Sequence, residues 1–205
     1  MKEIQQALSE IHLIRSQVAR GTQFRGYGPA SIAFTGLLAL GVAWAQNEWG
    51  GAQKHDLVFN LSVWICAAAV AVAVSGVETI ARARRVHYGL AQEMLQSAVE
   101  QFFPALVVGV LLTAVLVKIA PNEFWLFPGL WELIFSLGIF ASCRFLPRPM
   151  FGVGIWYLVA GLCSLLVSSG PKSFLPWTMG IPFGVGQLLV ACVLQFCVEG
   201  KIEEA

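Results

Sequence analysis

The sequence predicts an all-α, polytopic membrane protein with six transmembrane helices. The chain of 205 residues is 57% hydrophobic and only 12% charged, whereas an ordinary soluble domain carries about 25% charged residues. Six separate apolar stretches are long enough to cross the bilayer core, which takes about 20 residues of helix. The strand alternation that a membrane β-barrel needs is missing from the sequence. The lipid bilayer is therefore the predicted partner of most of the surface.

Short polar or turn-forming segments separate the six predicted spans. The spans cover residues 29–45, 57–77, 103–120, 127–146, 150–168 and 175–198. Only Pro147-Arg148-Pro149 lies between the fourth span and the fifth. Because proline cannot continue a helix, this turn predicts that the two spans are antiparallel neighbours.

Two internal matches favour an arrangement of three helical hairpins. The first and third spans open on Pro29-Ala30 and Pro104-Ala105, and each is followed at the same distance by an Asn-Glu pair. The fourth and sixth spans match at Pro128 and Pro176, and the motif that begins at Phe135 recurs at Phe183. All three hairpins would enter the membrane from the same side, as in a parallel repeat.

The basic residues predict the direction of the chain in the membrane. Every arginine, together with Lys2 and Lys201, falls on the side of the amino terminus, whereas the other side holds Lys54, Lys118 and Lys172. Cytoplasmic loops carry an excess of lysine and arginine, so both termini are predicted to be cytoplasmic. The formal net charge of +1 lacks the basic excess of a nucleic-acid-binding protein. We therefore expect no nucleic-acid partner.

Two cytoplasmic segments carry the pattern of amphipathic helices. Residues 1–25 form the first, because apolar residues that include Ile4, Ile11 and Ile14 recur at helical spacing. This helix would lie on the membrane surface, pair with its copy in a homo-oligomer, or dock on the second segment. The remaining residues, 26–205, form the transmembrane domain.

The second cytoplasmic segment covers residues 78–101 and opens on a basic cluster, Arg82, Arg84 and Arg85. These arginines have two interpretations. They set the topology and contact anionic lipid, at about 1 kcal/mol each near the surface, or they form a docking surface for a cytosolic protein partner.

A few polar residues inside the spans are the candidate ligand-binding residues. Glu132 and Ser136 lie one helical turn apart in the fourth span, and Gly184 and Gln187 share a face of the sixth. Ionisable residues in a membrane are costly and often functional. Glu132 therefore either reaches the outer interface or forms, with Gln187, a polar pocket between the fourth and sixth helices. A stripe in the fifth span is interpreted as a helix-packing surface. It comprises Gly154, Tyr157, Gly161, Ser164 and Ser168.

The sequence holds no pattern that is typical of a catalytic or metal-binding site. The histidines, His12, His55 and His87, all lie outside the predicted spans. Zinc-protease, nucleophile-elbow and nucleotide-binding motifs are missing. The five cysteines form no C-x-x-C pair and are interpreted as small buried hydrophobic residues. We therefore expect no enzymatic activity, no cofactor and no metal.

The amino-terminal region resembles that of a known family. Glu3-Ile4 leads to Ile11 and then to Ile14-Arg15-Ser16, followed by a glycine-bearing loop into the first span. Over residues 1–45 the chain resembles an uncharacterised family of bacterial six-helix membrane proteins, whose members are often encoded next to a winged-helix transcriptional regulator. The resemblance implies a bacterial inner (cytoplasmic) membrane and a regulatory or sensing role. It implies no reaction and no ligand.

Two functions from different classes fit these observations. The first is a non-enzymatic inner-membrane sensor or anchor, whose cytoplasmic helices contact a cytosolic partner. The alternative is a small-molecule transporter or a membrane-embedded substrate-binding transport subunit, in which Glu132 and Gln187 supply the polar groups. A third interpretation is a structural subunit of a larger membrane complex, which no motif in the sequence indicates directly.

Overall fold

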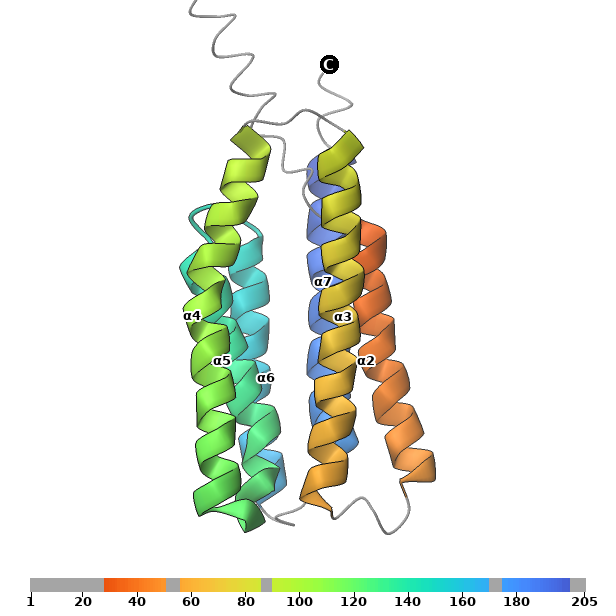
Figure 1. Ribbon diagram of the computed structural model, residues 1–205, viewed down its shortest axis with the longest axis vertical. Helices are drawn as coiled ribbons and strands as arrows, with labels where there is room; N and C mark the ends of the chain where they lie inside the picture. The colour runs from red at the N-terminus through yellow and green to blue at the C-terminus, as the bar shows by residue number, and fades with distance from the viewer. Residues whose placement is uncertain (1–27, 51–55, 86–89, 170–174, 200–205) are drawn as a thin grey trace, which may run out of the picture.

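The computed structural model describes residues 28–50, 56–85, 90–169 and 175–199, in which every regular element is a helix. Six helices are long and apolar enough to span a membrane, and they form an elongated bundle (Figure 1). The elements are α2 Pro29–Trp49, α3 Leu57–Arg85, α4 Leu90–Ile119, the 3-10 helix η2 Pro121–Leu126, α5 Phe127–Ser142, α6 Met150–Ser169 and α7 Pro176–Glu199. The predicted fold class, an all-α membrane protein with six spans, is confirmed.

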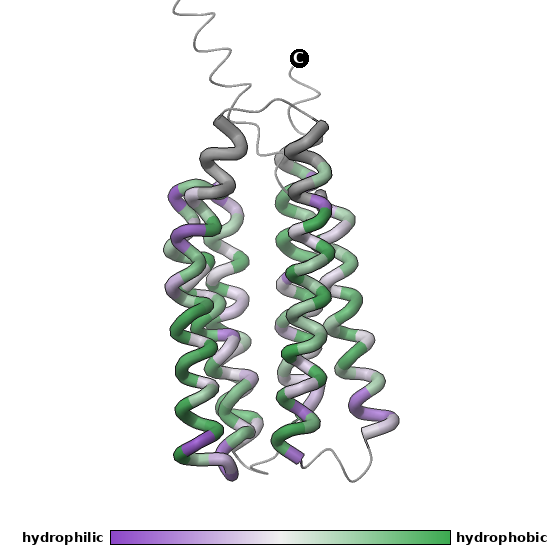
Figure 2. The backbone as a smooth tube through the Cα atoms, in the orientation of Figure 1, coloured by the Kyte–Doolittle hydropathy of each residue, from purple (hydrophilic) through white to green (hydrophobic). Residues whose placement is uncertain are grey.

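The surface of the bundle suits a lipid environment. Hydrophobic residues run along the middle of the helices, and the most hydrophilic ones lie near the helix ends (Figure 2). Large apolar side chains face outward, among them Leu37, Val110 and Leu166, of which the last is 75% exposed. Exposing such surface to water would cost about 25 cal/mol per Å², a cost that hydrocarbon removes. The chain is therefore a multi-pass membrane protein.

Two helices, α3 and α4, project beyond the others at the upper end of the bundle in Figure 1. We call this end the terminal end, because α2 begins and α7 ends there. α3 and α4 have 29 and 30 residues, or about 43 and 45 Å at 1.5 Å per residue. Their spanning parts are Leu57–Glu78 and Ser97–Ile119. Both helices therefore continue past their spanning parts at the terminal end and exceed the roughly 30 Å hydrocarbon core.

The predicted cytoplasmic segment 78–101 is not a separate helix. α3 continues without a break to Arg85, and α4 begins at Leu90 and runs through Pro104. The predicted third span begins at residue 103, where the continuous apolar stretch starts, and α4 passes through this point without a break. Proline removes one backbone hydrogen bond, but the apolar residues that follow keep α4 helical in lipid, where backbone groups must bond internally.

The closest helix pair joins the first span to the last. α2 packs more extensively on α7 than on its sequence neighbour α3. A Cβ atom on Gly36 would lie 2.8 Å from the main-chain oxygen of Gly184, and one on Gly184 would lie 2.5 Å from Cγ of Leu40. Gly180 faces Ala43 in the same way. Small residues four apart let membrane helices approach closely, so these glycines fix the α2–α7 pair.

α5 and α6 form the second closely packed pair. A Cβ atom on Gly129 would lie 2.7 Å from the main-chain oxygen of Gly161, and one on Gly161 would lie 3.0 Å from that of Gly129. The two helices are antiparallel neighbours across the turn that contains Pro147 and Pro149. The prediction drawn from that turn is confirmed.

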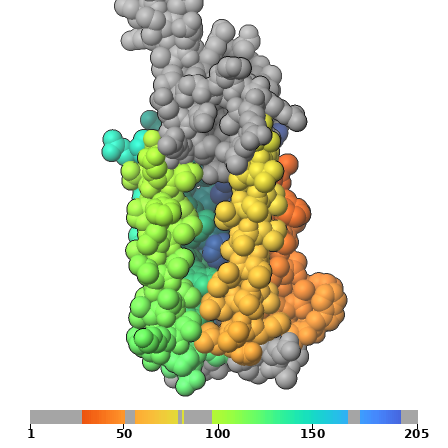
Figure 3. Space-filling model, in the orientation of Figure 1, coloured from red at the N-terminus to blue at the C-terminus, as the bar shows by residue number. Residues whose placement is uncertain are grey.

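The three helical hairpins, α2–α3, α4–α5 and α6–α7, form a ring that is open on one side. A closed ring would join successive hairpins through the pairs α3–α4, α5–α6 and α7–α2. The last two are the most extensive contacts of the molecule, whereas the described parts of α3 and α4 make no comparable contact. The space-filling view shows a groove between α3 and α4, with atoms of α7 and of the α5–α6 pair on its floor (Figure 3).

An aromatic cluster marks the centre of the bundle. Phe102 of α4, Phe135 of α5, Tyr157 of α6 and Phe183 of α7 meet with ring centroids 4.7–5.4 Å apart. Tyr157 is fully buried. Each such aromatic pair adds about 0.5–1.5 kcal/mol beyond its area burial, so this cluster holds four helices together beside the polar residues described next.

Candidate functional site

Glu132 lies inside the bundle rather than at the outer interface. It occupies the second turn of α5 and is 0% exposed. Its Oε2 accepts a hydrogen bond from the Ser164 hydroxyl of α6 at 3.0 Å. Burying a carboxyl in this way is costly unless its oxygens are partnered or neutralised. The hydrogen bond from Ser164 satisfies one oxygen only.

A proline in α7 brings a third helix to this point. Pro182 lies inside α7 and has no backbone N–H, so the carbonyl of Thr178, four residues earlier, loses its helical donor. That carbonyl lies 3.3 Å from the Ser164 hydroxyl oxygen. The single hydroxyl proton of Ser164 thus faces two acceptors, the Glu132 carboxyl and the Thr178 carbonyl. Oxygen atoms of α5, α6 and α7 converge here.

Several buried polar atoms around Glu132 have no hydrogen-bond partner. They are Oε1 of Glu132, Oγ of Ser136 and Oγ of Ser168, on residues that are all 0% exposed. Ser136 lies one turn from Glu132 on α5, and Ser168 lies one turn from Ser164 on α6. A buried polar group without a partner costs about 1–3 kcal/mol. Two of these atoms, on Glu132 and Ser136, lie one helical turn apart on the same face of α5.

No basic side chain of the neighbouring helices balances Glu132. The sequences of α5, α6 and α7 contain no lysine or arginine, and their only other acidic residue is Glu199 at the very end of α7. Lys118 of α4 is exposed. Among the residues that the structure describes, the carboxyl therefore lies in an apolar environment that contains hydroxyl and carbonyl oxygens and no fixed positive charge.

A second polar contact lies two turns along the same face of α6. Nε2 of Gln187 donates a long hydrogen bond of 3.5 Å to the Tyr157 hydroxyl. A Cβ atom on Gly186 would overlap the Tyr157 ring, so this glycine makes room for the tyrosine. Tyr157 links the Gln187 amide to the aromatic cluster around Phe135, next to Ser136.

The structure brings together some of the predicted ligand-binding residues and separates others. Glu132 and Ser136 share one buried site, and Gln187 lies beside it through Tyr157. Gly184 is directed away from this site, because it packs against Leu40 of α2. The predicted seam between the fourth and sixth helices is also incomplete, because the partner of Glu132 is Ser164 of the fifth predicted span.

Sequence reasoning missed Tyr157, Ser164 and Ser168 as site residues. They belong to the stripe in the fifth span that was interpreted as a packing surface. The signal available was their spacing, which places them on the same face of one helix. Hydropathy does not reveal which neighbouring helix such a face meets, so their link to Glu132 needed the fold.

A separate polar cluster joins α2 to α3 near the end of the bundle that lies away from the terminal end. Nε2 of Gln46 donates to Oδ1 of Asn60, and the Trp64 indole donates to Oε1 of Gln46 at 3.0 Å. The Asn60 amide donates to the Asp56 carbonyl at 2.7 Å. All three side chains are at least 96% buried. Because the amides satisfy one another, we interpret this cluster as an interhelical tie.

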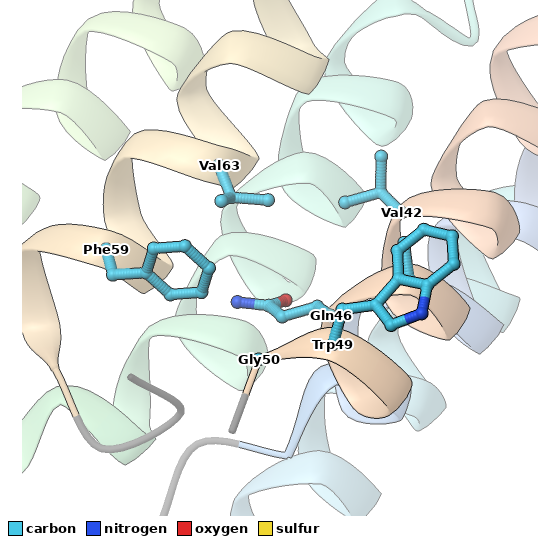
Figure 4. Close-up of a pocket in the computed structure, with 7 residues that line it drawn as sticks. Val42, Gln46, Trp49, Gly50, Phe59 and Val63 are labelled. Atoms are coloured by element: carbon cyan, nitrogen blue, oxygen red, sulfur yellow. The ribbon is translucent and has the colours of Figure 1, made fainter. Parts of the chain in front are cut away.

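A shallow pocket of about 340 Å³ opens beside this cluster (Figure 4). Val42, Gln46 and Trp49 of α2 line it on one side, and Phe59 and Val63 of α3 line it on the other. Ala45 and Gly50 complete the lining. The Gln46 amide, the polar side chain of this lining, is already bonded to Asn60 and Trp64. The pocket therefore offers mainly an apolar surface.

The predicted partner-binding residues fall where no side chain is described. Ile4, Ile11 and Ile14 lie outside the described residues. Arg82, Arg84 and Arg85 form the last turn of α3, and only its backbone is described.

Comparison with known proteins provides no relative from which the role of the site could be inferred. No family model, no curated protein and no solved structure matches the chain. Within the described residues, no group of three or more histidine, cysteine, aspartate or glutamate side chains is placed to hold a metal ion. The distinctive chemistry of the described bundle is the buried, oxygen-rich site around Glu132.

Proposed function

We propose that the chain is a non-enzymatic sensor or anchor of a bacterial inner membrane, which binds a cytosolic protein at the projecting ends of α3 and α4. The observation that carries the proposal is the length of these helices. Both exceed the roughly 30 Å hydrocarbon core and continue past their spans at the terminal end. The arginines at residues 82, 84 and 85 lie on this projection, with both termini at the same membrane face.

The limited packing of α3 supports a sensing role. In the described bundle, α3 packs mainly on α2, whereas α4 packs extensively on α5. The α2–α7 and α5–α6 pairs are fixed by glycine contacts. Parts of a protein with few packed contacts move at the lowest free-energy cost. A partner that binds the projecting ends can therefore shift α3 without unfolding the inner helices.

The burial of Glu132 supports a role without catalysis. Glu132 and Ser164, which form the closest acid–hydroxyl pair of the site, are 0% and 6% exposed. A hydrolytic substrate and its water would have to part the tightly packed α5 and α6 to reach them. This packing favours a structural or ion-binding role for the pair.

Site-specific photocrosslinking tests the proposal. A photoreactive amino acid at position 82, on the projecting end of α3, should crosslink a soluble protein in living cells. The same group at position 58, at the opposite end of α3, serves as the matched control and should capture none. A photoreactive amino acid within residues 1–25, the predicted amphipathic segment, should crosslink the same protein as position 82. Crosslinks at position 82 to lipid alone would contradict a cytosolic partner.

Transport is the second candidate function, and the unpartnered Oε1 of Glu132 favours it. Intramembrane carboxyls often mark ion or substrate pathways. Proteoliposomes with the wild-type chain should then accumulate at least one solute from a panel of labelled amino acids, vitamins and sugars. Glu132→Gln should abolish the uptake, and Glu48→Gln, a change at an exposed acid of α2, should leave it unchanged. Equal uptake by empty liposomes would reject this function.

A further inference from the structure

We propose that Glu132, Ser136, Ser164 and the main-chain carbonyl of Thr178 bind a dehydrated Na⁺ ion between α5, α6 and α7. The proposal depends neither on a sensing role nor on transport. It rests on three properties of the site: an excess of acceptor atoms, an unbalanced carboxyl, and a set of oxygen ligands that suits a small monovalent cation.

The acceptors of the site outnumber its donors. Oε2 of Glu132 and the Thr178 carbonyl compete for the Ser164 proton, and Oε1 of Glu132 and the Ser136 oxygen have no partner. The Thr178 hydroxyl does not help, because it donates to the Leu175 carbonyl at 2.7 Å. A site with surplus oxygen lone pairs attracts a cation.

The charge of the site points in the same direction. Buried charges in proteins are paired with an opposite charge or coordinate a metal ion. The helices that enclose Glu132 supply no lysine or arginine. One monovalent cation neutralises one carboxylate and leaves no net charge in the hydrocarbon region.

The ligand types select an alkali ion. Carboxylate, hydroxyl and carbonyl oxygens suit hard cations, whereas zinc and copper prefer imidazole or thiolate. A single carboxylate is few for Ca²⁺, which takes several oxygen ligands including acidic ones. Backbone carbonyls freed by an interrupted membrane helix are typical Na⁺ ligands, and Pro182 frees that of Thr178. The expectation of no metal rested on the positions and spacing of the histidines and cysteines, which Na⁺ does not require.

Burial favours a dehydrated ion. Glu132 and Ser136 are 0% exposed, and Ser164 is 6% exposed. A bare Na⁺ ion is smaller than a water molecule and can lie among close-packed oxygens. Because the hydroxyls and the carbonyl replace its water shell, the ion needs no water-sized cavity.

Two measurements on the full-length chain in detergent test the site. The first is the thermal unfolding midpoint in NaCl, KCl and choline chloride at equal ionic strength. The second is equilibrium binding of radioactive ²²Na⁺. We expect Na⁺ to raise the midpoint saturably, by mass action on the folded state, with one ion bound per chain. Glu132→Gln should abolish both effects, and Glu48→Gln, at an exposed acid, should retain them.

Ser136→Ala provides a variant that should fold even if Glu132→Gln does not. Its hydroxyl makes no hydrogen bond within the protein, so in choline chloride the midpoint should equal or exceed that of the wild type. Na⁺ affinity should fall at least about tenfold, as for loss of a group that supports a metal site. Unchanged affinity in Ser136→Ala, an equal response to K⁺, or no Na⁺ binding by the wild type would each overturn the proposal. In the last case a proton neutralises Glu132.

Discussion

At the scale of single residues, Glu132 could be singled out from the sequence and its partners could not. It is the only acidic residue of α5 and lies well inside an apolar span. Ser164 and Thr178 are unremarkable in sequence, since serine and threonine are common in membrane helices. Their role arises because Pro182 exposes a carbonyl at the level where α6 presents Ser164 to α5. Such a coincidence depends on helix neighbours, which hydropathy does not encode.

The two serines of α6 should differ sharply on substitution. Ser164→Ala removes the donor to Glu132 and should lower the free energy of unfolding by about 1–2 kcal/mol. Ser168→Ala is the matched control: the Ser168 hydroxyl is buried without a partner, so its removal should leave stability unchanged or raise it. Reversible unfolding in mixed detergent–SDS micelles, followed by circular dichroism in sodium-free buffer, measures both. Equal losses would contradict the hydrogen-bond assignment.

The tie between α2 and α3 predicts an energetic coupling between its members. Gln46→Leu and Trp64→Phe each remove one side of the 3.0 Å hydrogen bond, so the double variant should lose less stability than the sum of the single ones. We expect a coupling of about 0.5–1.5 kcal/mol. Trp156→Phe, whose indole bonds the Pro182 carbonyl elsewhere, is the control and should combine additively with Gln46→Leu. Additivity at Trp64 would refute the tie.

At the scale of the helices, the sequence predicted the existence of each span better than its limits. Apolar runs of sufficient length identified all six. The third span was predicted to begin at residue 103, whereas the spanning part of α4 begins at Ser97 and the helix itself at Leu90. The fourth span was predicted to run to residue 146, whereas α5 ends at Ser142. Hydropathy reports where lipid begins, whereas hydrogen bonding and turns determine where a helix ends.

The close approach of α2 and α7 predicts a strong penalty for one added methyl group. Gly180→Ala places its Cβ atom against that of Ala43 and should cost about 1–3 kcal/mol of stability by overpacking. Gly41→Ala, on α2 but facing open space, is the control. It should leave stability unchanged or raise it by up to about 1 kcal/mol. Unfolding in mixed micelles gives both values. A tolerated Gly180→Ala would mean that the two helices lie farther apart.

At the scale of the whole molecule, the order of helices around the bundle lay beyond the sequence. The Pro147-Arg148-Pro149 turn predicted one neighbour pair correctly, because a short turn allows no other arrangement. The pairing of the first span with the last has no such local signal. It follows from glycines on two segments that are far apart in the chain, whereas other described glycines, such as Gly41 and Gly152, face open space. The open side between α3 and α4 was equally unforeseen.

The proposed orientation predicts which surfaces a membrane-impermeant reagent reaches. In a variant whose five native cysteines are replaced, a cysteine at position 48 should react with an impermeant maleimide on intact spheroplasts. A cysteine at position 148, in the turn at the terminal end, should react only after the membrane is permeabilised. Glu48 and Arg148 are both exposed, so burial does not bias the comparison. Labelling of position 148 alone on intact spheroplasts would place the termini outside.

The contact between α2 and α7 also sets the order in which the molecule can be assembled. The ribosome synthesises α2 first and α7 last, and at 5–20 residues per second the interval between the end of α2 and the start of α7 is roughly 6–25 s. Throughout that interval the glycine and alanine face of α2 is covered by lipid or by an insertion factor rather than by its partner. The bundle therefore closes only when its final helix enters the membrane, and a chain cut short before Pro176 leaves the first helix without its principal neighbour.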